Sequence, residues 1–489
     1  MSGCIWDFAH DGVCRDTRYH VSMVLKSPNL QAAIDVAVDA VMAACADITG
    51  PRGSDPNRVA RMDNLMERLA DVRGRGGFYA SIGSGRGRGA LIELEDGSVK
   101  WDMITGIGVH GFGHSDPDSI RAAMQAATQD TVMQGNLQCN KEAIHFAEVV
   151  RSAARRGGAD MAHCYPACSG AMANENAMKV CMQARPSGAR VLAFRHNFIG
   201  RTLSLSQIGD SAGHREGLPE TMEVDLLPFW DPTDGPASTE RAVHALGEVM
   251  ARYPDAHACF VMELVQGEGG FNVAPRDFFV PLLDICKEAG IPIWFDEIQT
   301  FGRTETMFRF EGLDLGQYVD VITIGKMAQG CAALWRGNLN PRPGLLSGTY
   351  IGSTAAMTVG ATLIERLGSG DWYGPDGRNA TLHDVFHRRA TELIEAHPEC
   401  FPEVPGTNGP WPIVGGIGGM MRLTPFAGDK ARIASIVKNL FDAGVISFFC
   451  GHGPFHLRFL PPIGVLTPAE LESIMDIVGE VILAEQGRP

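Results

Sequence analysis

Reactive side chains stand where two apolar runs of the sequence end. Lys326 directly follows VDVITIG, and Asp296 and Gln299 follow IPIWF. In open α/β sheets, ligands bind beyond the carboxyl ends of the strands, so these side chains are expected to line a site. A buried lysine amine has a lowered pKa and can act as a nucleophile. The alternative is a structural lysine whose side chain extends so that its amine stays in solvent.

The carboxylate of Asp296 needs a cationic partner if the strand before it is buried. A protonated pyridine nitrogen would provide one, and the carboxylate would then hold the ring as an electron sink. The alternative is a salt bridge to a neighbouring arginine such as Arg303. The residues alone leave both interpretations open.

A helix with small residues at its start follows the run MAHCY. Ser169, Gly170 and Ala171 open this helix, and small side chains let backbone N–H groups approach an anion at its N-terminus. A phosphate site fits this pattern. A plain N-cap serine fits it equally well.

Short apolar runs alternate with helical stretches from about residue 100 onward. This pattern is typical of a parallel sheet covered by helices, and continuous apolar runs are expected of strands buried on both faces. The sequence therefore predicts an α/β fold with helices over 172–184 and 277–289. Strands are predicted over residues 161–165, 190–194, 258–265, 291–297 and 319–325.

Seven motifs together resemble those of the class III aminotransferases. In chain order they are CSGAMANENAMK, HNFIGRTLS, MELVQGEGG, FDEIQTFGRT, TIGKMAQG, SGTYIGSTA and LRFLPPIG, and they span about residues 90 to 465. Their order and spacing make the set far more specific than any single motif. The resemblance implies the pyridoxal-phosphate fold type I, a mostly parallel seven-stranded sheet covered by helices. A smaller α+β lobe is built from the two termini in that fold.

The expected domain organisation follows from this resemblance and from the breaker residues. Residues 1–75 form an N-terminal helical extension outside the resemblance, and 76–120 form the first part of the small domain. Residues 121–370 form the large cofactor-binding domain. Residues 371–489 complete the small domain.

The resemblance also implies a cofactor, pyridoxal 5′-phosphate (PLP), and a role for each residue around it. Lys326 would hold PLP as a Schiff base, Asp296 would pair with the pyridinium nitrogen, and Gln299 would bind the ring hydroxyl. The remaining implied contacts are Ser169, Gly170 and Ala171 at the phosphate, Phe198 stacked on the ring, and Thr349 at the phosphate of the neighbouring subunit. The family's active unit is accordingly a homodimer with shared sites.

By the same resemblance, Arg458 binds the substrate α-carboxylate, using the bidentate geometry of its guanidinium. Glu268 is its switchable partner, and Arg201 either holds a second carboxylate or has a structural role. These residues favour transamination between a ω-amino acid or related primary amine and an oxo acid, 2-oxoglutarate or glutamate. The freed Lys326 would move the substrate proton.

Three residues depart from the family pattern, and the first two could alter the substrate side of the pocket. Met172 stands where many members have glutamate, Ile199 where His, Trp or Tyr is frequent, and Ser353 where asparagine is usual. Another PLP reaction on the same scaffold, such as an aminomutase, racemase or decarboxylating transaminase, is therefore an alternative. A non-catalytic binding protein that kept the fold is a second one, and the presence of Lys326 and Asp296 speaks against it.

The formal net charge of −15 disfavours nucleic-acid binding, which depends on neutralising phosphates. The one exception is the stretch at residues 73–88, RGRGGFYASIGSGRGR, which superficially resembles an arginine-glycine RNA-binding tail. Its glycines lead into the strand-like ALIELEDGSVKWDM, so a structured loop that feeds a sheet is expected.

The twelve cysteines include no CxxC pair, and Cys164 and Cys168 have no matching Cys/His pair downstream. Zinc sites and disulfides are therefore not expected, and no metal is predicted. The first residues, MSGCIWDFAHDG, lack a basic region followed by an apolar one, and no apolar stretch is long enough for a membrane span. A reduced, cytoplasmic protein is predicted.

Overall fold

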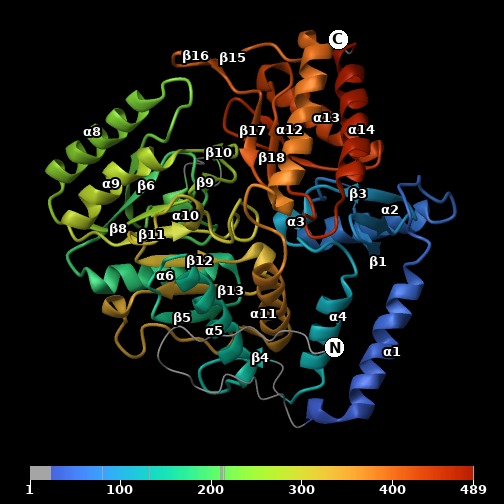
Figure 1. The fold of residues 1–489 in the computed structure, drawn as a ribbon, viewed down its shortest axis with the longest axis horizontal. Coiled ribbons are helices and arrows are strands. Elements are labelled where there is room, and N and C mark those ends of the chain that lie inside the picture. The colour runs from blue at the N-terminus through green and yellow to red at the C-terminus, as the bar shows by residue number, and fades with distance from the viewer. Residues whose placement is uncertain (1–23, 80, 131–132, 210–212, 214, 488–489) are drawn as a thin grey trace.

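The computed structural model describes residues 24–487 except residue 80 and residues 131–132, 210–212 and 214. The N-terminal stretch that showed no targeting pattern lies outside the described residues. Two lobes are visible in Figure 1, a larger one built on a central sheet and a smaller one that contains the C-terminal helices.

The central sheet has seven strands, as expected. Its order is β5-β13-β12-β11-β8-β6-β7. Six of the seven strands point in the same direction, and β13 alone runs opposite to them. The predicted mostly parallel α/β fold is therefore confirmed. The bounds are β5 (His163–Ala167), β13 (Cys331–Trp335), β12 (Val321–Ile324), β11 (Ile293–Asp296), β8 (His257–Met262), β6 (Arg190–Phe194) and β7 (Glu223–Leu227).

One predicted strand is divided in the structure. The run 258–265 was expected to be continuous, but β8 ends at Met262, and β9 (Val265–Gln266) turns away to pair with β10 (Asn272–Val273). The break coincides with Glu263, whose carboxylate accepts the backbone N–H of Gly267 at 2.9 Å. A buried acid that binds backbone amides therefore turns the chain where apolar composition alone predicted more strand.

Helices cover both faces of the central sheet (Figure 1). On one face α6 packs against β13, β12 and β8; on the other, α9 packs on β11 and α8 packs beside α9. Alternate strand residues divide between the two faces: Val191 belongs to the cluster on the α6 side, and Leu192 to the main core. Burial on both faces is why these strands are continuously apolar. The helices are α5 (Lys141–Arg156), α6 (Gly170–Ala184), α8 (Pro236–Arg252), α9 (Arg276–Glu288) and α11 (Thr354–Ser369).

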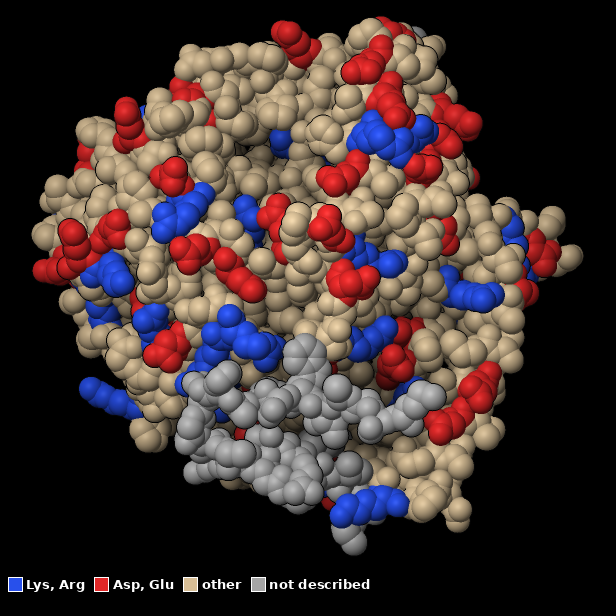
Figure 2. All heavy atoms as spheres, viewed as in Figure 1, with Lys and Arg blue, Asp and Glu red and all other residues tan. Residues whose placement is uncertain are grey.

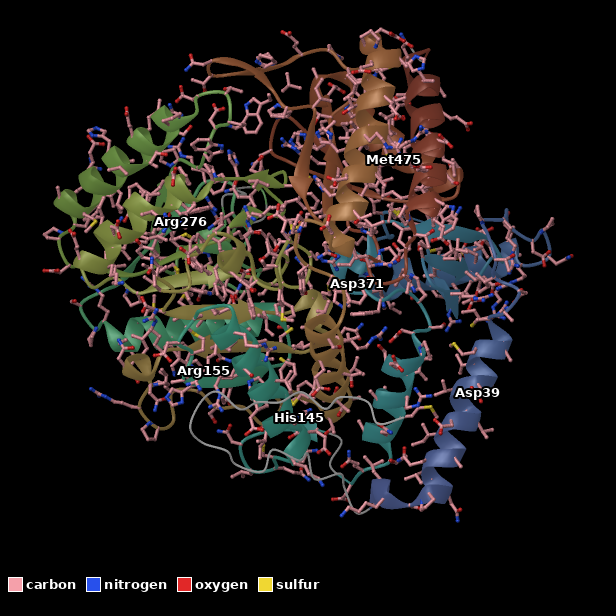
Figure 3. All side chains as sticks on the ribbon, viewed as in Figure 1. Asp39, His145, Arg155, Arg276, Asp371 and Met475 are labelled. Atoms are coloured by element: carbon pink, nitrogen blue, oxygen red, sulfur yellow. The ribbon has the colours of Figure 1, made fainter. Side chains whose placement is uncertain are left out.

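The smaller lobe joins the two ends of the chain, as expected. The N-terminal strands β1 (Gly83–Arg88), β2 (Leu91–Leu94) and β3 (Val99–Asp102) form a sheet with the C-terminal β19 (Val445–Ile446). A second sheet has the order β17-β18-β21-β20, with bounds Val414–Ile417, Met420–Leu423, His456–Phe459 and Phe448–Cys450. Three helices complete the lobe, α12 (Arg378–Ala396), α13 (Lys430–Asp442) and α14 (Pro468–Gln486). Met475 of α14 is buried beside α12 (Figure 3).

The glycine-arginine stretch is a loop that leads into a strand, as expected, and the strand begins within the stretch itself. Its last part is β1, which pairs antiparallel with β2. The side chain of Glu93 on β2 is only 1% exposed and forms ion pairs with Arg52, Arg58 and Arg86. These cations therefore compensate one buried acid. Elsewhere, acidic and basic side chains are interspersed over the face seen in Figure 2.

Two helices precede this sheet, α1 (Pro28–Ala44) and α2 (Val59–Arg73), where helix-like runs were predicted. Figure 1 shows α1 beside α4 (Pro117–Ala127). Ile34 and Val38 are the buried residues of α1, and Asp35 forms an ion pair with Arg121 at 3.0 Å. No helix among the described residues is both long and apolar enough to cross a bilayer.

The remaining elements are short. Two strand pairs are β4 (Met133–Gln134) with β14 (Gly352–Ser353), and β15 (Val404–Gly406) with β16 (Gly409–Trp411). Three one-turn helices are α3 (Thr105–Gly108), α7 (Leu205–Ile208) and α10 (Arg309–Gly312). The pairing of β4 with β14 matters for the site because it holds the loop that contains Thr349.

Candidate active site

The predicted site residues gather at one edge of the central sheet. Strands β6, β8, β11 and β12 are parallel neighbours, so their carboxyl ends meet there. Phe198 follows β6, Asp296 is the last residue of β11, and Lys326 follows β12 by two residues. The parallel topology thus brings together side chains that lie up to 128 residues apart in the chain, from 198 to 326.

Lys326 has an unusual backbone and an unusual environment. Its φ of 43° lies in the left-handed region, which costs a non-glycine residue about 1–3 kcal/mol and is often found at active sites. Burial lowers the pKa of its amine, and the nearby carboxylates Glu268 and Glu263 oppose that shift. The neutral, nucleophilic form is therefore more accessible than in an ordinary lysine.

Asp296 is 5% exposed and accepts two hydrogen bonds, from Asn174 Nδ2 at 2.8 Å and from the N–H of Ile298 at 2.9 Å. Burial raises its pKa to about 6, against the effect of those bonds and of the Lys326 charge. Within the described residues no Lys or Arg nitrogen is at ion-pair distance from it. The suggested partner Arg303 instead donates to the carbonyl of Gly108, so the salt-bridge alternative is wrong.

Gln299 lies directly against the backbone of Gly267. A Cβ on Gly267 would stand 2.7 Å from Gln299 Cδ, which only glycine avoids. Gln299 is 5% exposed, and its Oε1 has no hydrogen-bond partner among the described residues. A buried amide oxygen in this state is an acceptor in need of a donor.

Ser169 is the N-cap of α6, and its Oγ accepts the N–H of Met172 at 3.2 Å. The helix start is closely packed, because a Cβ on Gly170 would lie 2.9 Å from Ile298 Cδ1. The first backbone N–H groups of a helix have no intrahelical partner. The capping role and an anion site at the same helix start are therefore compatible.

Glu268 and Arg458 form an ion pair of 2.6 Å between the two lobes. The Arg458 side chain is fully buried, and its Nε and Nη2 have no partner within the described part of the chain. Burial would raise the pKa of Glu268, but the charge of Arg458, with those of Lys326 and Arg201, holds it below its ordinary value. Glu268 thus stays ionised on an arginine that can bind a further acid. The Arg201 guanidinium lies 5.3 Å from the centre of the Phe198 ring.

Thr349 does not join this group within the chain. It lies on an exposed loop that is fastened to the β4 segment, with Asn136 N–H donating to Gly348 O at 3.1 Å and Ile351 N–H to Gln134 O at 2.8 Å. Its action on a neighbouring subunit stays a prediction.

The three departures from the family pattern have different surroundings. Met172 is exposed in the first turn of α6, whereas Ile199 is buried and its carbonyl accepts Asn174 Nδ2 at 2.6 Å. Ser353 is the N-cap of α11, where its Oγ accepts the N–H of Ala356 at 3.1 Å. Of the three residues, only Met172 has a side chain that faces solvent, so only this side chain could contact a substrate directly.

Two buried residues of the site were not predicted from the sequence. Glu263 accepts the N–H of Phe198 and of Gly267, and Asn174 binds Asp296. Burial, and then the charge of Asp296, raise the pKa of Glu263 to about 8, while Lys326 opposes them. The signal that could have revealed Glu263 is the one used for Lys326 and Asp296, a charged residue at the end of an apolar run. Asn174 lies inside a helix and carries no comparable signal.

Comparison with known proteins agrees with this geometry. A family model described as aminotransferase class-III matches residues 66–482. The chain belongs to the class III aminotransferases. Two curated class III relatives illustrate the match. The diaminobutyrate–2-oxoglutarate transaminase of Wolinella succinogenes is 25% identical over 419 residues, 82% of this chain and 93% of the relative. The mitochondrial acetylornithine aminotransferase of Eremothecium gossypii is 30% identical over 297 residues, 58% of this chain and 68% of the relative.

Solved structures share the class III fold. A lysine aminotransferase from M. tuberculosis, in the internal aldimine form, superposes with a TM-score of 0.73 at 21% identity. The match covers 86% of this chain and 99% of that one. The chain is accordingly a PLP-dependent transaminase of fold type I, as the motif series implied.

The residues at the sheet edge fit PLP. A buried carboxylate with no ion-pair partner suits a pyridinium nitrogen, and the unpaired Oε1 of Gln299 suits a hydroxyl donor. The tight helix start at Gly170 suits a phosphate. Among the described residues no cluster of His, Cys, Asp or Glu could hold a metal ion.

Proposed function

We propose that this class III aminotransferase transfers an amino group between a ω-amino acid or related primary amine and an oxo acid, with 2-oxoglutarate and glutamate as the second pair. The observation that carries the proposal is the ion pair of 2.6 Å between the fully buried Arg458 and the partly exposed Glu268. Two relatives support the substrate class, since one is named for diaminobutyrate and 2-oxoglutarate and another for acetylornithine.

The ion pair explains how one pocket accepts two kinds of substrate. While Glu268 occupies Arg458, the charge of the arginine is neutralised and a substrate end without a carboxylate fits beside it. When a dicarboxylate enters, its carboxylate would displace Glu268 from Nη1 of Arg458 and could also accept from Nε and Nη2, which have no partner among the described residues. Arg201, whose charge also reaches Glu268, would take the second carboxylate.

Bound PLP supplies an electron sink for the bond broken at the substrate carbon. Asp296 would hold the ring nitrogen protonated by its charge, Phe198 would cover the ring, and Gln299 would bind its hydroxyl. Gly170 and Ala171 would hold the phosphate through backbone N–H groups. Lys326 Nζ would hold the cofactor and then take the proton from the substrate carbon, which its lowered pKa would allow.

A half-reaction screen tests this proposal. The purified holo-protein is mixed with single amines, and the visible absorbance of the bound cofactor is followed without any acceptor. Glutamate and at least one ω-amine, such as diaminobutyrate or lysine, are expected to bleach the band. With a racemase, an aminomutase or a binding protein, the absorbance band would remain after glutamate is added. If no amine bleaches it, the proposed substrate class is wrong.

We propose that the active unit is a homodimer with shared sites. Apolar side chains are exposed close to the Thr349 loop and the β4 segment, namely Met133, Leu137, Ile144 and Tyr350. Such a cluster favours a protein partner, and a second copy would place Thr349 at the neighbouring site. Sedimentation equilibrium is expected to give the mass of two chains. A fully active monomer would contradict this arrangement.

We also propose a cytoplasmic location. The ten cysteines within the described residues are all free thiols, and several are buried. Free thiols are typical of proteins that work in a reducing compartment.

A further inference from the structure

Glu263 lies at the centre of the site but has no part in the chemistry above. It follows β8, the strand between β6 and β11, and its side chain is 5% exposed. Its Oε1 accepts the N–H of Phe198 at 2.8 Å, and its Oε2 accepts the N–H of Gly267 at 2.9 Å. One carboxylate thereby bridges the turn after β6 and the turn that contains Glu268.

A carboxyl group suits this bridge because each of its two oxygens faces a backbone donor. Both oxygens keep lone pairs that can accept these bonds, whether or not the group holds a proton at its raised pKa of about 8. A glutamine of the same length would offer one acceptor and would direct its NH₂ at the second N–H. A buried donor left facing another donor costs about 1–3 kcal/mol. The two backbone amides therefore explain why an acid is buried at this position.

The two turns that Glu263 joins are tightly packed. A Cβ on Gly267 would stand 2.7 Å from Gln299 Cδ, and one on Gly269 would stand 2.4 Å from the carbonyl oxygen of His196. A shift of the Gly267 amide would consequently move the backbone that lies against Gln299 and supports Glu268. Close-packed interiors transmit such shifts.

The turn after β6 is held from its other side as well. Asn174 Nδ2 donates to the Ile199 carbonyl at 2.6 Å and to Asp296 Oδ2 at 2.8 Å. The Phe198 N–H is thus linked through Glu263 to the Glu268 turn, and the Ile199 carbonyl is linked through Asn174 to Asp296.

We propose that Glu263 is a positioning residue that fixes the spacing between the ring-facing Phe198 and the carboxylate switch Glu268. It acts through the backbone amides of Phe198 and Gly267. The inference rests on the proposed roles of Phe198 and Glu268. A general stabilising role is the competing explanation, and the chain offers a matched control for it.

The control is Glu297, which follows Asp296 in the chain, is fully buried and makes a comparable bridge with its side chain bonded to residues 300 and 310. It accepts the N–H of Phe310 at 2.9 Å and the hydroxyl of Thr300. Burial raises its pKa to about 6. Glu263→Gln and Glu297→Gln each remove one buried acid and one acceptor, so they differ mainly in which loops they release.

The test compares the two variants as holo-proteins by thermal melting, by visible circular dichroism of the bound cofactor, and by single-turnover rates with glutamate. Both variants are expected to melt earlier. Only Glu263→Gln is expected to change the circular dichroism band and to lower the rate by about 10- to 100-fold, because misplacement by 1 Å can cost about 100-fold. If Glu263→Gln does not fold, Glu263→Asp, which keeps the charge but reaches one amide, is expected to show the same two changes.

Equal circular dichroism and equal rates in the two variants would overturn the proposal and leave Glu263 a stabilising residue. Failure of the proposed function gives a different result. In that case the wild type itself does not react with glutamate, while the circular dichroism comparison still reports whether Glu263 orients the cofactor's surroundings.

Discussion

Lys326→Ala is expected to abolish turnover and to leave PLP removable by dialysis. Lys326 is the only lysine placed at the carboxyl edge of the sheet in the described part of the chain, and its amine would both hold the cofactor and move the substrate proton. A positioned acid or base contributes about 10²- to 10⁴-fold to a rate, so kcat is expected to fall by at least about 10³-fold. Single-turnover assays and absorbance spectra before and after dialysis measure both effects.

Lys287→Ala is the matched control for this experiment. Lys287 is exposed on α9, on the outside of the large lobe, and its substitution is expected to leave rate and spectrum unchanged. The alanine at 326 inherits the strained backbone at φ 43°, so both variants should be melted to confirm folding. Turnover within tenfold of the wild type in Lys326→Ala would refute the assignment of the lysine.

Asp296→Asn is expected to have the second largest effect, a loss of about 10²- to 10³-fold in kcat, as when one preorganised electrostatic group is removed. The amide keeps the size of the side chain and can still accept the N–H of Ile298. It cannot hold a ring nitrogen protonated by charge. PLP affinity is therefore also expected to fall, which equilibrium titration of the cofactor-free protein would measure.

The same substitution should change the pH dependence of stability in the cofactor-free protein. Because the folded-state pKa of Asp296 is raised to about 6 and the unfolded value is about 3.9, the folded state holds a proton that the unfolded state has lost. The contribution of this group to the free energy of unfolding therefore falls as pH rises from about 4 to about 6. Denaturant melts of Asp296→Asn should show a shallower fall than those of the wild type, because only the contribution of Asp296 is removed and that of Glu297, whose pKa is also raised to about 6, remains.

Asp314→Asn serves as the control because its side chain is 92% exposed. It is expected to leave cofactor affinity, kcat and the pH dependence of the melts as in the wild type. If Asp296→Asn binds PLP as tightly as this control does, the pairing of Asp296 with the ring nitrogen is wrong.

Local sequence patterns were sufficient for the residues at strand ends. Lys326, Asp296 and Gln299 each follow an apolar run, and the run itself reports a buried strand, so their placement needed no long-range information. Ser169 was predictable in the same way, because N-cap preferences depend on the next three residues. Glu263 was not predicted as a site residue because it was taken as part of the strand from 258 to 265, although the chain turns there.

By itself, the sequence determined the alternation of strands and helices, the candidate lysine at a strand end and the family, since apolar periodicity and short motifs are local properties. Only the tertiary structure decided which distant segments meet. Arg458 lies 190 residues from Glu268, and a partly buried ion pair joins them across the lobes. Likewise, the bridge from Glu263 to Phe198 and Gly267 exists because parallel strands bring their carboxyl ends to one edge. Hydrogen bonds between buried groups depend on that packing, which no local pattern records.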